Sequence, residues 1–363
     1  MRKIFLIVLV LNVFCSKVRS QEVNLQEYLS KHQYSIHVNA DSSLLFSSTL
    51  QEALSAKMKD KKLFIFGEGG SHFLILNHKL LQVLKKYFIV NGMRYFFVES
   101  DPGYAVAVNS YINSSYLNSE LPFYKEYKPD FDDLKKMFNQ GHEITYVGID
   151  FTRPRSFQLA ISNIAKHLDE NTINKITVIA PYVKDTIYLT YDLKRFIKYY
   201  KDIRNDFARD SSTLKTLLRD QFSDFKELLT NANTALPNGD RDHPMAENLL
   251  NKLNSDPGAY ISFLDCGGYH SRPNQKGTLA NILSKSVELS GKIVVLNVFC
   301  ENCITKVEKV SNWTLPFMKG TILESFSSAA KDDIVLFDLS ELSSDYQYIK
   351  EYGDYLLYAR NQN

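Results

Sequence analysis

A carboxylate and an imidazole lie four positions apart in a short glycine-rich segment, residues 67–72, whose sequence is GEGGSH. Glu68 supplies the carboxylate. His72 supplies the imidazole, which exchanges its proton near neutral pH and can act as a general base. The glycines let the backbone turn sharply and approach a ligand closely. The segment is a candidate catalytic loop, and the alternative is a tight turn that carries a surface histidine.

Two further acids end later apolar runs in an equivalent position. Glu99 ends the run FFVE, and Asp150 ends the run VGID. Because the carboxyl ends of parallel strands meet at the same edge of a sheet, we expect Glu99 to lie near Glu68 and His72. Two carboxylates and an imidazole form a general-base or metal-binding arrangement. Asp150 either joins this site or holds its loop.

A second glycine-rich segment, residues 265–270, has the sequence DCGGYH and also follows an apolar run. It repeats the order of a strand, glycines and a histidine. Its histidine, His270, is one of only eight in the chain. On the same sheet edge as His72, it would provide a second catalytic imidazole. The alternative is a polar loop residue.

The elements that must position these residues are predicted from short apolar runs, which indicate strands buried on both faces. The runs are 63–66, 95–98, 145–149, 260–264, 293–298 and 334–337. Between the first two, apolar residues recur at helical spacing over 74–91. A strand, a helix and a strand in this order predict parallel strands joined by a right-handed crossover. The fold class is therefore α/β, with a mostly parallel sheet flanked by helices.

A charged helical pattern interrupts the strands from about residue 183 to 235 and predicts two or three long amphipathic helices. This helical insertion forms either a lid over the strand ends or a side layer that only packs. A further helix is expected over 241–253, and 352–359 indicates a final strand or short edge element. We expect residues 21–363 to form a single domain.

Several segments, taken in order, resemble the landmarks of the erythromycin esterase-like family. The most specific is RDHPMAEN at 241–248, which opens a predicted helix. The others are Gly67-Glu68 with His72, Asn77 to Leu81, Glu99, Gly148 to Asp150, and His270, while 354–358 looks like the family's last strand. The resemblance implies a divergent member of this family.

The resemblance also implies a role for each matching residue. His72 would be the general base that activates a water molecule, Glu68 and Glu99 would support it, and His270 would assist as the second imidazole. Asp150, Arg241 and Asp242 would bind substrate or support the site. This chemistry needs no serine nucleophile, and the sequence contains no Gly-x-Ser-x-Gly elbow.

Three functions are compatible with these residues. The first is hydrolysis of a small ester or lactone by histidine-assisted attack of water, without a cofactor. The second is hydrolysis with a divalent metal held by Glu68, His72, Glu99 and His270, since the related Tiki-type proteases share a similar pattern. The third is ligand binding without catalysis, because His72 lies four residues after Glu68 whereas the family usually places its histidine three residues after the glutamate.

The beginning of the chain predicts export. Two basic residues precede an apolar run over 4–14, and small residues stand before Gln21, which is typical of a signal peptide over residues 1–20. The run is shorter than the roughly 20 residues that span a bilayer. The residues before Cys15 do not fit a lipoprotein signal. We expect a periplasmic or extracellular protein without an integral membrane span.

Removal of residues 1–20 deletes four basic residues and no acid, so the formal net charge changes from +2 to −2. A nearly neutral chain with dispersed charges has no electrostatic footprint for nucleic acid, and we expect a small-molecule substrate. Cys300 and Cys303 are close enough in sequence to form a disulfide in an oxidising compartment. A redox pair and a structural link both remain open.

Overall fold

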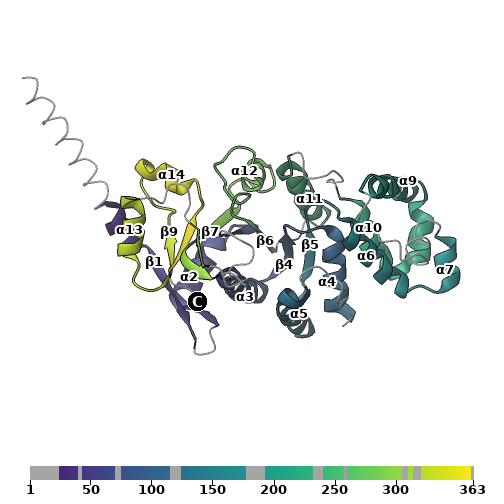
Figure 1. The fold of residues 1–363 in the computed structure, drawn as a ribbon, viewed down its shortest axis with the longest axis horizontal. Coiled ribbons are helices and arrows are strands. Elements are labelled where there is room, and N and C mark those ends of the chain that lie inside the picture. The colour runs from purple at the N-terminus through teal and green to yellow at the C-terminus, as the bar shows by residue number, and fades with distance from the viewer. Residues whose placement is uncertain are drawn as a thin grey trace, which may run out of the picture. The chain divides into compact units, whose positions relative to one another are not determined.

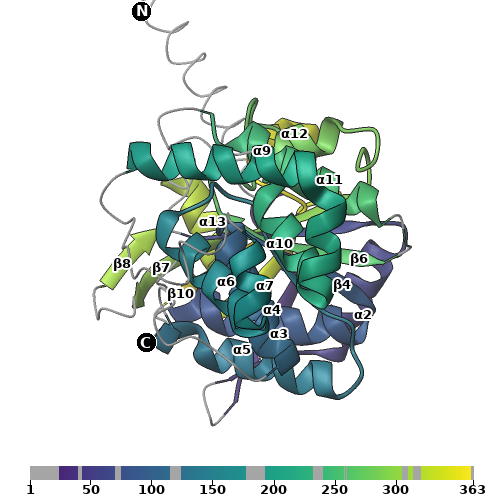
Figure 2. The same ribbon diagram turned by 90° about the vertical axis from the view of Figure 1, so that its right-hand side faces the viewer.

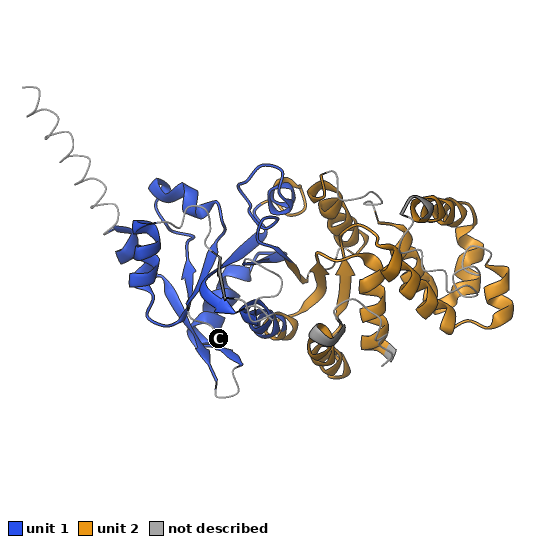
Figure 3. Cartoon of the chain, viewed as in Figure 1, with its two compact units in different colours: residues 1–85, 266–284, 291–363 blue, residues 86–265, 285–290 orange. Residues whose placement is uncertain are grey.

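The structure, a computed structural model, describes residues 24–39, 43–69, 75–114, 124–176, 193–231, 240–256, 258, 260–304, 310–313 and 320–360. The chain divides into two units, coloured blue and orange in Figure 3. Unit 1 comprises 1–85, 266–284 and 291–363, and unit 2 comprises 86–265 and 285–290. The predicted signal peptide lies outside the described residues. The prediction of a single domain stays a prediction.

Unit 1 is built around strands that pair in the order β2-β1-β9-β10-β7-β3, with β8 on β7. The strands are β1 (Gln33–Val38), β2 (Leu44–Phe46), β3 (Leu63–Glu68), β7 (Ile293–Ile304), β8 (Val310–Trp313), β9 (Ile334–Asp338) and β10 (Tyr355–Arg360). The pairs β10-β7 and β7-β3 are parallel. The pairs that involve β1, β2, β8 and β9 are antiparallel.

Helices accompany these strands (Figure 1). They are α2 (Ser48–Met58), α3 (Ile75–Val90), α12 (Leu279–Lys285), α13 (Thr321–Ala329) and α14 (Gln347–Lys350), with a 3₁₀ turn η3 (Ser344–Tyr346) and a helical stretch over 24–31. Residues 86–90 of α3 and Lys285 of α12 belong to unit 2. Leu29, Phe299, Phe326, Val335 and Tyr358 belong to one apolar cluster, which packs 24–31 and α13 against the strands. All six residues of β3 are buried, as its apolar sequence predicts.

Unit 2 contains strands that pair in the order β6-β4-β5, all parallel. The strands are β4 (Met93–Val98), β5 (Thr145–Gly148) and β6 (Ile261–Gly267), whose last two residues belong to unit 1. The helices are α4 (Pro102–Ser114), α5 (Tyr124–Asn139), α6 (Pro154–Lys166), α7 (Glu170–Lys175), α9 (Leu193–Leu218), α10 (Phe222–Leu229) and α11 (Asp242–Ser255), with a 3₁₀ turn η2 (Arg219–Gln221).

The described part of the helical insertion forms a side layer in unit 2 (Figure 2). α9 and α10 share an apolar cluster with α6, in which Phe157 of α6 contacts Phe196 and Tyr200 of α9 at ring distances of 5.7 and 5.4 Å. Phe225 and Leu228 contribute from α10. A lid function of these helices stays a prediction.

The α/β prediction is confirmed, and each predicted apolar run forms a strand. One alternative is wrong: the final strand, β10, is not an edge element, because it pairs with β9 on one side and β7 on the other. The antiparallel hairpin of β1 and β2 was not predicted, since its strands are short and leave Val38 and Leu45 half exposed. In the described part of the chain, no helix has the length and apolar character needed to cross a bilayer.

Phe157→Ala tests the side layer. Phe157 is fully buried between α6 and α9, so its truncation should lower the free energy of unfolding by about 3–5 kcal/mol in urea titrations. Val287→Ala is the control in the same unit: this side chain is 90% exposed, and the change should stay within about 0.5 kcal/mol. Equal effects of the two substitutions would contradict the packing described here.

Candidate functional site

Glu68 lies at the carboxyl end of β3, and the second glycine-rich segment lies beside it. The carbonyl oxygen of Glu68 accepts a hydrogen bond of 2.9 Å from the backbone N–H of Gly268. A Cβ atom at Gly268 would stand only 2.7 Å from that oxygen, so only glycine permits this approach. Unit 1 therefore brings together the backbones of the two segments that carry Glu68 and His270.

Hydrogen bonds of two side chains, Ser271 and Asn297, hold the second segment in place. The Ser271 hydroxyl lies 3.0 Å from the carbonyl oxygen of Gly268 and 2.5 Å from Oδ1 of Asn297. Nδ2 of Asn297, a buried residue of β7, donates to the carbonyl oxygen of Tyr352. Gly67 leaves the room for this network, since a Cβ there would collide with Asn297 and Ser271. Asn297 is a polar residue inside an apolar run, a signal that the sequence analysis missed.

His270 is fixed through its backbone. Its N–H donates to Gly267 O and its carbonyl oxygen accepts from Ala280, both at 2.9 Å. The imidazole is half-buried, and its centroid lies 5.6 Å from the Tyr269 ring at an interplanar angle of 87°. His72 lies outside the described residues, so its catalytic role stays a prediction.

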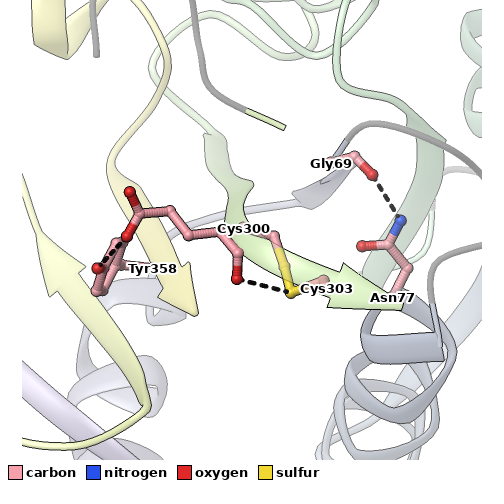
Figure 4. The surroundings of a disulfide bond; sticks show 6 residues. Gly69, Asn77, Cys300, Cys303 and Tyr358 are labelled. Carbon is pink, nitrogen blue, oxygen red and sulfur yellow. Dashed lines mark hydrogen bonds between the residues drawn. A yellow bond between two sulfur atoms is a disulfide. The ribbon is translucent and has the colours of Figure 1, made fainter. Parts of the chain in front are cut away.

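The chain that leads from β3 toward His72 is anchored at its beginning. Nδ2 of Asn77 in α3 donates a hydrogen bond of 3.0 Å to the carbonyl oxygen of Gly69, as Figure 4 shows. A Cβ at Gly69 would lie 2.7 Å from the carbonyl oxygen of Val298, so this residue sits directly against β7. Asn77 belongs to a segment that resembles a family landmark, and the contact gives it a positioning role.

The disulfide in β7 joins Cys300 and Cys303, whose Cα atoms are 6.0 Å apart (Figure 4). Both residues are buried, which favours the structural link over an accessible redox pair. Glu301 between them accepts a hydrogen bond of 2.6 Å from the hydroxyl of Tyr358 on the neighbouring strand. Cys266 is a buried free thiol.

In unit 2, one arginine joins the two acids that end neighbouring strands. Arg241 Nη2 lies 3.0 Å from Glu99 Oε1 and 2.7 Å from Asp150 Oδ2, and its Nε lies 3.3 Å from Asp150 Oδ1. The Asp150 side chain is fully buried, and that of Glu99 is 10% exposed. Burial lowers the pKa of Arg241, but the hydrogen bonds and charges of Asp150 and Glu99 outweigh it and raise that pKa.

Hydrogen bonds from one backbone N–H and two side-chain amides hold the strand ends around this ion cluster. The N–H of Asp150 donates to Ser100 O at 2.9 Å, and Asn231 Nδ2 donates to Asp150 O at 2.8 Å. Asn248 Nδ2 donates to Ile149 O at 2.9 Å. Asn248 belongs to the RDHPMAEN segment. The first two turns of α11 therefore carry a residue that fixes the strand contacted by Arg241, which directly precedes this helix.

Asp101 is a buried acid of this region that the sequence analysis did not single out. Burial raises its pKa to about 6, while Arg153 and the hydrogen bonds from Ser156 and the Tyr104 N–H act in the opposite direction. Asp150 adds a repulsive charge that also raises the pKa. Arg153 Nη2 lies 3.7 Å from Asp150 Oδ2, so it serves both acids. The position of Asp101 two residues after Glu99 was its only sequence signal.

Asp242 begins α11 and is buried. Its N–H donates a hydrogen bond of 3.1 Å to Oδ1 of Asp240, and an acid in the first helical turn is favourable for the helix dipole. A role of Asp242 in substrate binding stays a prediction.

The expected convergence of Glu68, His72, Glu99 and His270 on one catalytic centre also stays a prediction.

A divalent metal was one of the functional alternatives. Among the described residues, no group of three His, Cys, Asp or Glu side chains is arranged to hold a metal ion. The proposed set includes His72, which is not described, so a metal site remains a prediction.

Neither a protein-family model nor a curated protein matches the sequence. Solved structures do match. A histidine-to-asparagine mutant of the erythromycin esterase EreC, in its open conformation, has a TM-score of 0.57 at 14% identity, covering 87% of this chain and 94% of that one. The chain shares its fold with an erythromycin esterase.

Two further solved structures are similar to this chain. A Bacillus cereus protein has a TM-score of 0.66 at 12% identity, over 93% of this chain and 97% of its own. A succinoglycan biosynthesis protein has a TM-score of 0.64 at 13% identity, over 94% and 97%. At such low identity the similarity concerns the fold alone, and the chemistry must be argued from the residues of this chain.

Arg241→Met should destabilise the protein by about 3 kcal/mol, because it leaves the buried Asp150 carboxylate without its main counter-charge. Urea unfolding measures this loss, and Asp150→Asn in the same chain should recover part of it. Arg209→Met removes an exposed arginine that pairs with Asp206 and Asp210, and it should change the stability far less than Arg241→Met, because solvent screens both ion pairs. Similar losses for both arginines would contradict a special role of Arg241.

Asp101→Asn should change stability with pH. A carboxyl whose folded pKa is raised from 3.8 to about 6 favours folding below pH 4 and loses this contribution as the pH rises through 6. The variant should therefore gain about 2–3 kcal/mol relative to the parent between pH 4 and pH 7.5.

The exposed Asp169 offers a control of opposite sign. Its carboxylate caps α7 by accepting from Thr172 N–H, and this hydrogen bond lowers its pKa. Asp169→Asn should lose stability relative to the parent as the pH rises toward 3.8, and the difference should be nearly constant above pH 4, where Asp101→Asn changes. Chemical unfolding at several pH values measures both differences. A pH-independent difference for Asp101→Asn would refute the assignment.

Proposed function

We propose that this protein is an exported hydrolase of a small ester or lactone. The observation that carries the proposal is the direct backbone contact between Glu68 and Gly268, within a fold shared with an erythromycin esterase. It holds beside each other the two strand-end segments that carry Glu68 and His270.

In the proposed mechanism, His72 removes a proton from a water molecule whose oxygen attacks the carbonyl carbon. The resulting tetrahedral intermediate collapses, the bond from carbon to the leaving oxygen breaks, and the alcohol oxygen receives a proton from an imidazolium. His270 assists at this stage as the second imidazole. The products are a carboxylate and an alcohol, joined in one molecule when the substrate is a lactone.

The carboxylates of Glu68 and Glu99 orient the base and the water in this mechanism. Arg241 holds Glu99 in a defined position through its bond to Oε1, and Asp150 holds Arg241 from the other side. Arg241 and Asp150 are thus positioning residues. This division of roles assigns a function to the ion pair between Arg241 and the fully buried Asp150.

The proposal is tested with purified protein that begins at Gln21 and a panel of aryl esters, alkyl esters and lactones of increasing ring size. His72→Ala should lower kcat/KM at least a hundredfold, and Glu68→Gln, Glu99→Gln and His270→Ala should each lower it at least tenfold. His37→Ala, on the exposed side of β1, is the control and should leave kcat/KM unchanged. Turnover that survives His72→Ala would overturn the proposed mechanism.

A chelator arm in the same assay separates the alternatives. Activity that persists after treatment with EDTA supports water activation by histidine alone. Loss of activity with recovery on adding Zn²⁺ or Mn²⁺ would replace it by metal-assisted hydrolysis. A chain that hydrolyses nothing, yet is thermally stabilised by a lactone, would be a binding protein of the same fold.

A further inference from the structure

A cavity of about 420 Å³ lies in unit 2 between α10 and α11, at the end of β5. Its size is within the range of small-molecule pockets, about 300–1,000 Å³. The residues that line it are Pro102, Val147, Gly148, Ser223, Lys226, Glu227, Thr230, Asn231, Asn248, Asn251, Lys252 and Ser255. None of the residues proposed above for ester hydrolysis is among them.

The lining comes from one face of each helix. Ser223, Lys226, Glu227 and Thr230 follow helical spacing along α10, and Asn248, Asn251, Lys252 and Ser255 follow it along α11. The opposite face of α10 is apolar and buried in the cluster shared with α6 and α9. Two polar helix faces are thus turned toward each other across a cavity, whereas helices that only pack present apolar faces to each other.

Some polar atoms of the lining already have structural partners. Asn231 and Asn248 hold the backbone at the end of β5, and Lys252 Nζ lies 2.9 Å from Glu227 Oε2. Glu227 Oε1, by contrast, is buried and has no hydrogen-bond partner among the described residues. A buried carboxylate oxygen without a donor is unfavourable, and the Glu227 side chain lines the cavity, so a turn of this carboxylate toward the cavity would let a ligand donate a hydrogen bond to it.

The remaining groups specify the ligand further. Lys226, next to Glu227 on the lining, offers an ammonium group, and Asn251 offers an exposed amide across the cavity. The lining described above contains no aromatic side chain and only two apolar ones, Val147 and Pro102. An apolar ligand would leave these polar groups without partners, whereas vicinal hydroxyl groups donate to the carboxylate and accept from the amide and the ammonium.

We propose that this cavity binds a polyhydroxylated molecule of the size of a simple sugar, with one hydroxyl donating to the carboxylate of Glu227 and others accepting from Asn251 and Lys226. The site lies within unit 2 and is independent of the proposed hydrolysis. A ligand bound there contacts Asn231 and Asn248, the two residues that hold the strand end behind Arg241.

Saturation-transfer NMR on the full mature chain tests this proposal, since it detects weak sugar binding. Glucose and glucuronate are the probes, and 1,6-hexanediol, which has no vicinal hydroxyls, is the negative control. Glu227→Gln should weaken binding of both sugars at least tenfold, because a neutral amide accepts a hydrogen bond less strongly than a carboxylate. Asn251→Ala should weaken binding several-fold. The side chain is exposed and makes no hydrogen bond among the described residues, so the variant should fold.

Lys226→Ala separates neutral from acidic sugars. If the acid group faces this ammonium, the variant should weaken binding of glucuronate more than that of glucose; equal weakening assigns the site to neutral sugars. Lys201→Ala, an exposed lysine of α9, is the matched control and should change neither. The proposal is overturned if neither sugar shows transfer, or if Glu227→Gln and Asn251→Ala, with unchanged Tm, bind both as the parent does. His72→Ala should leave sugar binding unchanged, which distinguishes this site from the hydrolytic one.

Discussion

The fully buried carboxylate of Asp150 is the constraint on which unit 2 depends. An ionised carboxylate away from water must be paired and hydrogen-bonded, and Arg241 meets this need with both Nε and Nη2. The same guanidinium reaches Glu99, so it links the ends of β5 and β4 to the beginning of α11. One guanidinium group therefore fixes the ends of both strands, the start of this helix and the orientation of Glu99, a candidate catalytic acid.

In unit 1, glycines rather than charged residues determine how closely the strand-end segments approach each other. Gly268 allows a backbone hydrogen bond to Glu68, and Gly67 leaves room for Ser271 and Asn297. Any side chain at these glycines would push the two strand-end segments apart. Close approach of backbones is a common reason for glycine near a ligand site, because main-chain groups then become available beside catalytic side chains.

The helical layer of unit 2 has two kinds of surface. Its apolar side packs around Phe157 and stabilises the unit, while the polar side of α10 faces that of α11 across a cavity. Asn231 and Asn248 belong to both the cavity lining and the support of β5. Occupancy of the cavity and the geometry around Asp150 are thereby connected through two amide side chains.

Much of this architecture is contained in local patterns of the sequence. Apolar runs predict the strands, helical periodicity predicts α3, α9, α10 and α11, and the positions of Glu68, Glu99, Asp150 and His270 after strands follow directly. These features can be read locally because a strand buried on both faces gives a continuous apolar run, and a helix buried on one side gives apolar residues at helical spacing. The antiparallel pairing of β9, β10, β1 and β2 has no such signature, since strand order depends on contacts between distant segments.

The sequence by itself determined which residues stand at strand ends and therefore which could do chemistry. Only the tertiary structure decided that Arg241 pairs with both Glu99 and Asp150, that Asp101 is buried, and that Asn297 supports the segment of His270. The physical reason is that ion pairing and burial join residues as far apart as 142 positions along the chain, and spacing along a sequence carries no information about such distances.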